Sequence, residues 1–361
     1  MSRWPKTSNH AVHDDCTGQV GGNRPGSRWC FRSHISVAFT ILAVLLALAA
    51  DVDWFGWFGQ LVSAMGWRIA AFGFLFSIIQ WLAKSRRCAT ITAAASCFML
   101  LPSLVLSPRA SSTSASSDGL RIRLLIANVH ALNQSPDELL EMLSESDADV
   151  LILTEPPPPV MRALRPNERL AQQFPFVARS KPDRGTQSWL VVASRMPLTQ
   201  ASGATPGMNP VVVSASGREI GILATHMRSP RSLARYRQAR EQVRTVTALA
   251  KEFTNRNLPI ILAGDLNAPP GSHLSRQLIR STGMARSKPR RILAGSWPAH
   301  IPRWAALPID GALVSPGITI DHWDLVALPG SDHRGLRIDL VVPKPGSDAQ
   351  SHHSGSSPPN P

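Results

Sequence analysis

Leu258-Pro-Ile-Ile-Leu-Ala-Gly-Asp-Leu-Asn267 is the stretch that decides the fold. Its apolar run from Leu258 to Ala263 predicts a buried β-strand. Asp265 and Asn267 follow the run two residues apart, so on an extended segment their side chains share one face. A carboxylate beside an amide oxygen suits a hard cation such as Mg²⁺. Gly-Asp-Leu-Asn is also a plausible turn, so this segment alone leaves both interpretations open.

Five further polar motifs share this arrangement, each standing at the end of an apolar run. They are Ile126-Ala127-Asn128, Thr154-Glu155, Thr225-His226, Ile309-Asp310 and Ser331-Asp332-His333. Taken singly, each reads as an ordinary turn or strand end. Together they supply the carboxylates, amides and histidines that metal-assisted phosphate chemistry uses. Because they are far apart in the chain, only a fold gathers them into one site.

The segment 120–342 is predicted to form one α/β domain. Strands are expected over 121–127, 150–153, 188–194, 211–215, 220–224, 258–263, 311–314 and 337–341, and helices over 136–146, 231–253 and 272–281. Several strands arrive in hairpin-like pairs. We therefore expect a two-layer β-sandwich flanked by helices rather than a simple doubly wound sheet.

The region before this domain is apolar and predicts a membrane anchor. Three apolar segments lie near 34–50, 61–83 and 89–106. A membrane helix needs roughly 20 apolar residues, and the second segment meets this by length although Arg68 interrupts it. A signal peptide is the alternative for the first segment, but more hydrophobic sequence follows it rather than a soluble domain. Arg68 is expected to reach an interface or to face a neighbouring helix.

The charges around these segments predict their orientation. Lys and Arg residues precede the first segment and fill the second loop, whereas the first loop holds Asp51 and Asp53. The positive-inside rule then places the N-terminus in the cytoplasm and the domain on the other side. Residues 1–33 and the tail 343–361 are expected to be disordered, and 108–119 to be a flexible linker.

Composition adds one statement about partners and one about disulfides. The chain has 361 residues and a net charge of +14, which favours anionic partners or simply a solubilising surface. All four cysteines precede residue 100, which excludes a disulfide framework for the catalytic part. No protein partner is expected.

The six motifs, in this order, resemble those of the endonuclease/exonuclease/phosphatase superfamily. Gly264-Asp265-Leu266-Asn267 matches its Gly-Asp-x-Asn signature, and Ser331-Asp332-His333-Arg334 matches its terminal motif. The family includes deoxyribonucleases, apurinic endonucleases, inositol-polyphosphate phosphatases and neutral sphingomyelinases. The resemblance covers about residues 120–342 and implies the deoxyribonuclease-like four-layer fold. Membrane-anchored bacterial members look similar, which implies a multi-pass inner-membrane protein with a periplasmic catalytic domain.

The resemblance also implies a role for each motif residue. Glu155 would be the principal ligand of Mg²⁺, with Mn²⁺ able to substitute, Asn128 nearby and Asp332 as a candidate second carboxylate. His333 would act on the attacking water and be oriented by Asp310. Asp265 and Asn267 would position water and phosphate oxygens, and His226 would stabilise the transition state or protonate the leaving oxygen. Family members differ over whether the residue like His333 or the one like Asp265 takes the proton.

The expected function is that of a membrane-anchored, nuclease-like phosphoesterase acting on phosphodiesters or phosphomonoesters. Arg228 and further arginines after His226, together with Arg290 and Arg291, are candidates for holding phosphates. The substrate would be nucleic acid or, as the alternative, a lipid headgroup cut by a sphingomyelinase-like activity. A non-catalytic binding module would require a missing catalytic group, and none is missing. Two departures from the family pattern, the four prolines after Glu155 and Gly335, remove no catalytic atom.

Overall fold

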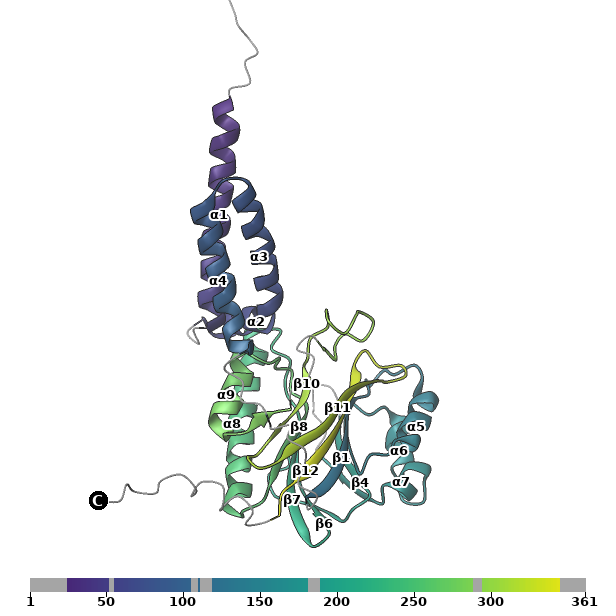
Figure 1. Cartoon of the computed structure of the whole chain (residues 1–361). Coiled ribbons are helices and arrows are strands. Elements are labelled where there is room, and N and C mark those ends of the chain that lie inside the picture. The colour runs from purple at the N-terminus through teal and green to yellow at the C-terminus, as the bar shows by residue number, and fades with distance from the viewer. Residues whose placement is uncertain are drawn as a thin grey trace, which may run out of the picture.

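Two six-stranded sheets face one another in the C-terminal part of the chain (Figure 1). The computed structural model describes residues 25–51, 55–104, 110, 119–180, 189–287 and 294–344. The predictions for residues 1–24, for most of the 108–119 linker, for the tail beyond 344 and for the pair Arg290 and Arg291 lie outside the described residues. The prediction of disorder over 1–33 is wrong for residues 25–33, which are helical and begin α1 (Pro25–Asp51).

The first sheet has the order β11-β12-β1-β2-β4-β3. Its strands are β11 (Thr319–Ala327), β12 (Arg334–Val342), β1 (Leu120–Asn128), β2 (Val150–Thr154), β4 (Leu190–Ser194) and β3 (Phe176–Arg179). β1 and β2 pair in parallel at its centre, and the other pairings are antiparallel.

The second sheet has the order β5-β6-β7-β8-β10-β9. Its strands are β5 (Leu198–Gln200), β6 (Met208–Ala215), β7 (Arg218–His226), β8 (Ile260–Asp265), β10 (Asp310–Val314) and β9 (Ala285–Arg286). β7 and β8 form its parallel pair. Each sheet therefore has one pair of parallel strands, and the carboxyl ends of these two strands lie at the same edge of the sheet.

Alternating side chains of each central strand serve two different cores. Leu124 and Ile126 of β1 point into the core between the sheets. Leu125 of the same strand packs with Leu139 and Phe174, under α5 (Pro136–Glu145), α6 (Pro158–Ala163) and α7 (Arg169–Gln173). α8 (Leu233–Asn255) and α9 (His273–Thr282) cover the outer face of the second sheet. Burial on both faces explains the unbroken apolar runs, and each fully buried large side chain contributes roughly 2 kcal/mol.

The predicted fold class is confirmed: the domain is mixed α/β, with two sheets covered by helices. All eight predicted strands and all three predicted helices are present, with ends shifted by a few residues. The prediction lacked the short helices α6 and α7 and the strands β3, β5, β9 and β11. Three of these strands, β3, β5 and β9, are short. The fourth, β11, carries Asp321, His322 and Asp324 at a sheet edge, where one face is solvated.

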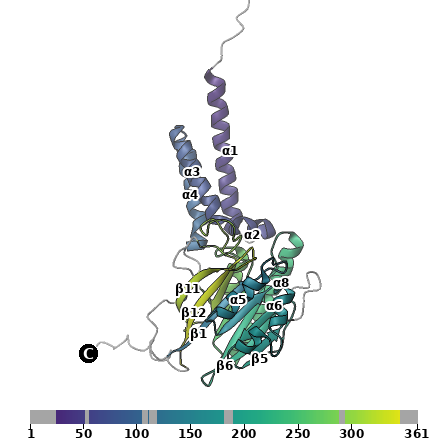
Figure 2. The ribbon, with the colours of Figure 1, turned by 90° about the vertical axis from the view of Figure 1, so that its right-hand side faces the viewer.

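The N-terminal region is a bundle of helices rising from one end of the sandwich (Figures 1 and 2). It consists of α1 (Pro25–Asp51), α2 (Gly56–Ala64), α3 (Gly66–Leu82) and α4 (Arg86–Leu104). The structure differs from the prediction of one helix over 61–83, because the chain bends by 71° between α2 and α3. In the described part of the chain, no single helix is both long and apolar enough to cross a membrane, although that bent pair together meets the criterion.

Candidate active site

The second sheet sets three polar side chains in one row. His226 ends β7 and pairs in register with Asp265 at the end of β8, and Asp265 pairs in register with Asp310 at the start of β10. Register partners on neighbouring strands project from the same face of a sheet. The row is therefore a direct consequence of where the three strands end.

The first sheet brings its polar residues to the same edge. Asn128 ends β1 opposite Thr154 of β2, so Glu155 follows immediately, and His333 precedes β12. The Asn128 side-chain amide donates a hydrogen bond of 3.1 Å to Asp265 Oδ2. This bond joins the two sheets at the centre of the site.

Backbone conformation at the site is strained. Glu155 has φ +54° and Asn267 has φ +44°, values that side-chain-bearing residues seldom adopt and that cost about 1–3 kcal/mol each. Gly264, at φ +146°, lies so close to β7 that a β-carbon there would collide with the carbonyl oxygen of Thr225. Only glycine at position 264 allows β8 to lie this close to β7 and to place Asp265 beside His226.

His333 and Asp310 form a buried hydrogen-bonded pair. His333 Nδ1 lies 2.8 Å from Asp310 Oδ2, and the Asp310 side chain is fully buried. The loop that carries His333 is fixed by Ser331, whose hydroxyl accepts from the His333 N–H and donates to the Asn128 carbonyl at 2.7 Å. Since Nδ1 donates to Asp310, Nε2 is the nitrogen that can accept a proton from a reactant.

The charges of this cluster perturb one another. Burial first, and then the nearby Asp310 carboxylate, raise the pKa of Asp265 to about 6. For His333, burial lowers the pKa but the charge and hydrogen bond of Asp310 outweigh it, which raises the pKa to about 9. Perturbed titrating groups of this kind mark functional sites.

Glu155 and His226 form the open side of the cluster. His226 Nε2 lies 3.4 Å from Glu155 Oε1 and 3.7 Å from Asp265 Oδ2. The Glu155 side chain is 27 % exposed, whereas that of Asp265 is 2 % exposed. Glu155 therefore offers a carboxylate that solvent or a ligand can reach.

The charges of this cluster favour a divalent cation beside it. Asp265, Asp310 and His333 each offer a ligand atom within 4.8 Å of the others. Asp310 Oδ1 is buried without a hydrogen-bond partner, and burial together with the Asp310 charge raises the pKa of Asp265. A nearby cation would relieve both, and carboxylate and amide oxygens are the ligands that hard cations take.

The remaining predicted residues lie around this cluster. The Asn267 N–H donates to Asp265 Oδ1 at 3.0 Å, and its side-chain amide donates to the Met227 carbonyl. The Arg228 N–H donates to Gln242 Oε1, and Arg228 itself is half-buried. These contacts hold Asn267 and Arg228 at the border of the site.

Asp332 lies at the rim rather than in the inner cluster. Its side chain is 46 % exposed, accepts from Trp297 Nε1 at 2.9 Å, and lies 3.5 Å from His130 Nδ1. No pattern in the sequence links Trp297 or His130 to Asp332, because neither belongs to a polar motif at a strand end. The structure adds both to the surroundings of the site.

Arg334 and Ser296 also support the site, and the sequence did not predict this role. The Arg334 guanidinium donates to the carbonyls of Gly295, Ala299 and Ile301 and so holds the loop 294–307 against the start of β12. Ser296 Oγ accepts from the N–H of Asp310. The resemblance had matched Arg334 without assigning it a task, and the structure shows that it braces this loop.

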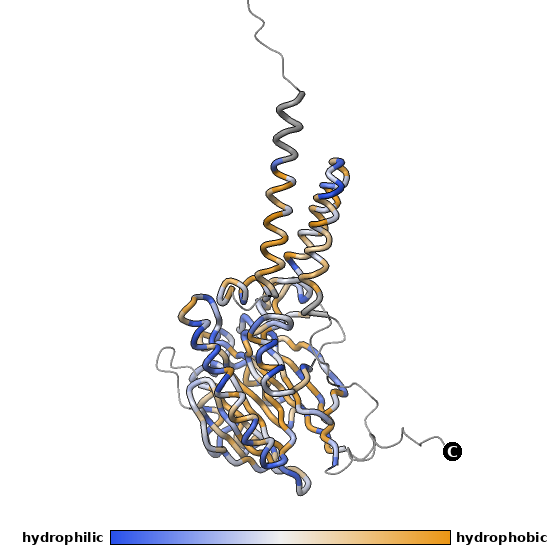
Figure 3. Tube along the Cα trace, turned by 90° about the vertical axis from the view of Figure 1, so that its left-hand side faces the viewer, coloured by the Kyte–Doolittle hydropathy of each residue, from blue (hydrophilic) through white to orange (hydrophobic). Residues whose placement is uncertain are grey.

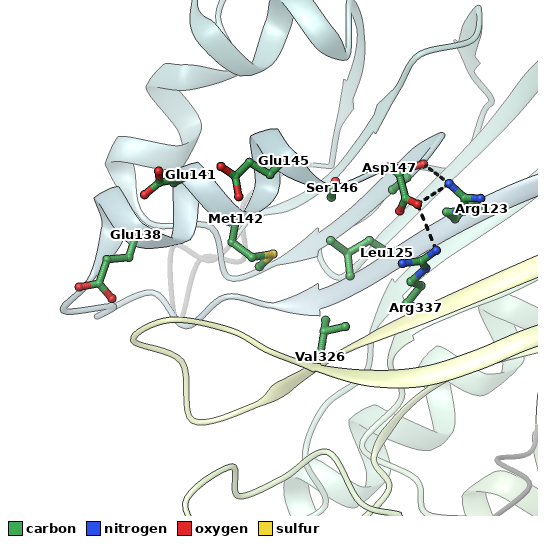
Figure 4. A pocket seen from close by; sticks show the side chains of 11 residues that line it. Arg123, Leu125, Glu138, Glu141, Met142, Glu145, Ser146, Asp147, Val326 and Arg337 are labelled. Carbon is green, nitrogen blue, oxygen red and sulfur yellow. Dashed lines mark hydrogen bonds and ion pairs between the residues drawn. The ribbon is translucent and has the colours of Figure 1, made fainter.

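One cavity lies away from these residues. A cavity of about 600 Å³ lies between α5 and the first sheet, lined by Glu138, Glu141 and Glu145 (Figure 4). Asp147 there bridges Arg123 at 2.6 Å and Arg337 at 3.1 Å. Both arginines are thus occupied, and the cavity contains none of the motif residues.

Comparisons with known proteins agree with the motifs. The model of the Endonuclease/Exonuclease/phosphatase family matches residues 125–333, more than half of the chain. No curated protein matches the sequence.

Solved structures that are similar include three bacterial proteins. An endonuclease/exonuclease/phosphatase from Beutenbergia cavernae is 19 % identical, with 62 % of this chain and 72 % of that chain covered and a TM-score of 0.45. Sphingomyelinase C from Streptomyces griseocarneus is 16 % identical, with 62 % and 100 % covered and a TM-score of 0.45. A 3'-5' exonuclease from Neisseria meningitidis is 15 % identical, with 60 % and 98 % covered and a TM-score of 0.45.

Proposed function

We infer, because the chain belongs to the endonuclease/exonuclease/phosphatase family of metal-dependent phosphoester hydrolases, that it cleaves phosphodiester bonds with Mg²⁺ at this site. The observation that carries the proposal is the buried His333–Asp310 pair at 2.8 Å beside Asp265. A histidine held by a carboxylate is the arrangement that general-base hydrolysis needs.

In the proposed reaction, His333 takes a proton from the attacking water through Nε2. The water oxygen bonds to phosphorus, the bond from phosphorus to the ester oxygen breaks, and that oxygen leaves with a proton. Asp310 holds the imidazole ring and stabilises its charged form. Asp265 is a poorer base, because both its oxygens already accept hydrogen bonds from Asn267 and Asn128.

The residues proposed to hold the metal are Glu155 and Asn128, with Asp332 at the rim. In the described part of the chain, the carboxylate of Glu155 has one polar contact, with His226, so its oxygens can take a ligand. Bound Mg²⁺, or Mn²⁺ in its place, would neutralise charge on the phosphoryl oxygens and lower the pKa of His333.

His226, Asn267 and Arg228 are proposed to bind the phosphate. The His226 side chain is 21 % exposed and faces the gap between Glu155 and Asp265, where a phosphoryl oxygen can reach it. From this position His226 donates to the leaving oxygen. Asn267 and Arg228 follow β8 and β7, and both lie at the same edge of the sheet.

The test uses the full chain in detergent with bis(p-nitrophenyl) phosphate as substrate. We expect hydrolysis with Mg²⁺ or Mn²⁺, its loss in EDTA, and a drop of about 100-fold or more in His333→Ala. His322→Ala is the matched control, because His322 is exposed on β11, away from the site. Equal rates for His333→Ala and His322→Ala would remove His333 from the mechanism.

We also propose that the helices anchor the chain in the bacterial inner membrane, with the domain on the periplasmic side. The bundle is apolar outside, and polar contacts lie among the apolar side chains of its interior. Thr40 and Thr92 hydroxyls lie 3.1 Å apart in its interior, and Gln80 donates to Thr40. Outward-facing side chains such as Phe72 and Leu75 are more than half exposed. Polar contacts between helices with apolar surroundings are typical of bundles in lipid.

Length and charge support the same proposal. α3 and α4 have 17 and 19 residues, or about 26 and 28 Å, close to the roughly 30 Å of a bilayer core. Figure 3 shows apolar residues along the helices and a hydrophilic tip between α3 and α4, where Lys84, Arg86 and Arg87 lie. An alkaline phosphatase fused to the C-terminus should be active in the periplasm. An inactive phosphatase together with a fluorescent green fluorescent protein fusion would reverse the orientation.

A further inference from the structure

The helical bundle is docked on the catalytic domain through a buried polar contact. The carbonyl of Ala50 accepts from His273 Nε2 at 2.8 Å and from Arg276 at 3.0 Å. Gln60 Oε1 accepts from the N–H of Leu274 at 2.9 Å. Because these groups are buried, losing any one partner leaves another unsatisfied. The bundle and the start of α9 are therefore held in a defined orientation relative to each other.

Two further side chains of the bundle, Trp57 and Arg68, donate hydrogen bonds to loops on either side of the active site. Trp57 Nε1 in α2 donates to the carbonyl of Pro230 at 2.7 Å, four residues after His226. Arg68, near the start of α3, donates to the carbonyls of Ala305 and Ala306 at 2.6 Å each. Ala305 and Ala306 belong to the loop 294–307, which Arg334 fixes beside the site.

These contacts place both loops at the level where the apolar bundle begins. α2 lies across the end of α3, from which it is bent by 71°, and carries Trp57 and the half-exposed Phe58. Amphipathic aromatic rings of this kind prefer the boundary between lipid and water. A bilayer around α1, α3 and α4 would therefore begin near α2, beside Pro230 and Ala305.

Three of the large apolar side chains that the domain exposes are close in the chain to a strand end at the site or belong to loop 294–307. In the described part of the domain, the exposed large apolar residues are Leu132, Phe176, Leu233 and Trp304. Leu132 is 73 % exposed and follows the end of β1, and Trp304 is 60 % exposed and precedes the carbonyl that Arg68 binds. Leu233 is 46 % exposed and lies three residues after Pro230. Figures 1 and 2 show that loop 294–307 extends to the side from which the helices rise.

We propose that this rim, formed by Leu132, Leu233 and Trp304, rests on the bilayer surface and turns the active site toward it. The substrate is then a phosphoester in the headgroup of a membrane lipid, and it reaches His333 without leaving the bilayer. This proposal rests on the proposed hydrolase function of the same site. Isolated apolar side chains on water-facing loops are unremarkable, but three at one edge beside an apolar bundle form an interaction surface.

The first test measures contact with the bilayer. The full chain without native cysteines is reconstituted in phosphatidylcholine and phosphatidylglycerol nanodiscs, and an environment-sensitive fluorophore is attached in Leu132→Cys, Trp304→Cys or Ser214→Cys. Ser214 is exposed near the far end of β6 and serves as the control. We expect blue-shifted emission and quenching by nitroxide-labelled lipid at 132 and 304 only. Equal, water-like emission at all three positions would overturn the proposal.

The second test separates the lipid substrate from the hydrolase function. The double variant Leu132→Ser, Trp304→Ser should release headgroup phosphate from nanodisc lipids about tenfold more slowly than the unaltered chain. Its rate on soluble bis(p-nitrophenyl) phosphate should stay within about twofold, which shows that the variant is folded. If the unaltered chain does not hydrolyse soluble bis(p-nitrophenyl) phosphate, the proposed hydrolase function is refuted. A DNA oligonucleotide cleaved faster than any lipid, with the double variant unimpaired on both, would refute the lipid substrate alone.

Discussion

Removal of the Asp310 charge should lower the pKa of His333 by a measurable amount. Asp310 provides the two largest influences that raise this pKa, from 6.5 to about 9, while burial lowers it. In Asp310→Asn the burial remains and only the smaller influences of Asp265 and Asp332 still raise the pKa, so we expect the pKa of His333 well below 9. The difference between 6.5 and about 9 corresponds to about 3 kcal/mol, at 1.36 kcal/mol per pH unit.

The sign of the linked stability follows from the raised pKa. A histidine that binds its proton more tightly in the folded state stabilises the fold fully below pH 6.5, and this contribution is lost as the pH rises through about 9. The pKa of Asp265 is also raised, to about 6, so its contribution is present below 3.8 and lost as the pH rises through 6. The metal-free protein should therefore lose stability toward alkaline pH, and Asp310→Asn should remove the part above pH 6.5.

The assay is an NMR titration of the chain in nanodiscs with EDTA, using carbon-13 labels in histidine. His333→Gln assigns the resonance, and Asp321→Asn, an exposed carboxylate on β11 that pairs with Arg121, is the charge-matched control. We expect one histidine titrating near 9 in the unaltered protein and in Asp321→Asn, but not in Asp310→Asn. A His333 resonance that titrates near 6.5 in all three proteins would refute the reasoning.

Two other substitutions test the backbone and the proposed metal ligand of the site. Gly264→Ala should lower the free energy of unfolding by more than Gly217→Ala, because both glycines have positive φ but only the first would collide with Thr225; the positive φ alone costs about 1–3 kcal/mol, and thermal unfolding measures the difference. Equal losses in the two variants would show that the collision is relieved at no cost. Glu155→Gln should weaken Mn²⁺ binding about tenfold or more, as measured by electron paramagnetic resonance, whereas Glu138→Gln, at an exposed glutamate, should leave the affinity unchanged. An unchanged affinity in Glu155→Gln would exclude Glu155 as the principal metal ligand.

The sheets were predictable because their central strands are buried on both faces and read as apolar runs. The end of the run at Ala263 gave the end of β8 to within two residues. β11 was not predictable, since Asp321, His322 and Asp324 are tolerated only because an edge strand keeps one face in water. Nothing local in a sequence states which strand is at an edge.

The residues of the site were predictable as types, but their pairing was not. The motifs indicated that Asp310 and His333 belong together through resemblance, while their hydrogen bond depends on β10 and the loop before β12 meeting across two sheets. The contribution of Trp297 to Asp332 had no signal at all, because the contact forms between residues 35 positions apart on two loops. Contacts between loops are set by tertiary packing rather than by local pattern.

Arg68 shows how the two halves of the chain depend on one another. In the sequence it was a costly charge inside an apolar segment, with an interface or a neighbouring helix as its expected partner. In the structure its partners are two carbonyls of the loop that Arg334 also holds, so one charged side chain connects α3 to the surroundings of the active site. A charge placed there for solubility alone would need no such partners. The hydrogen bonds to Ala305 and Ala306 offset part of the cost of Arg68 in the apolar segment, and they fix loop 294–307 against the bundle.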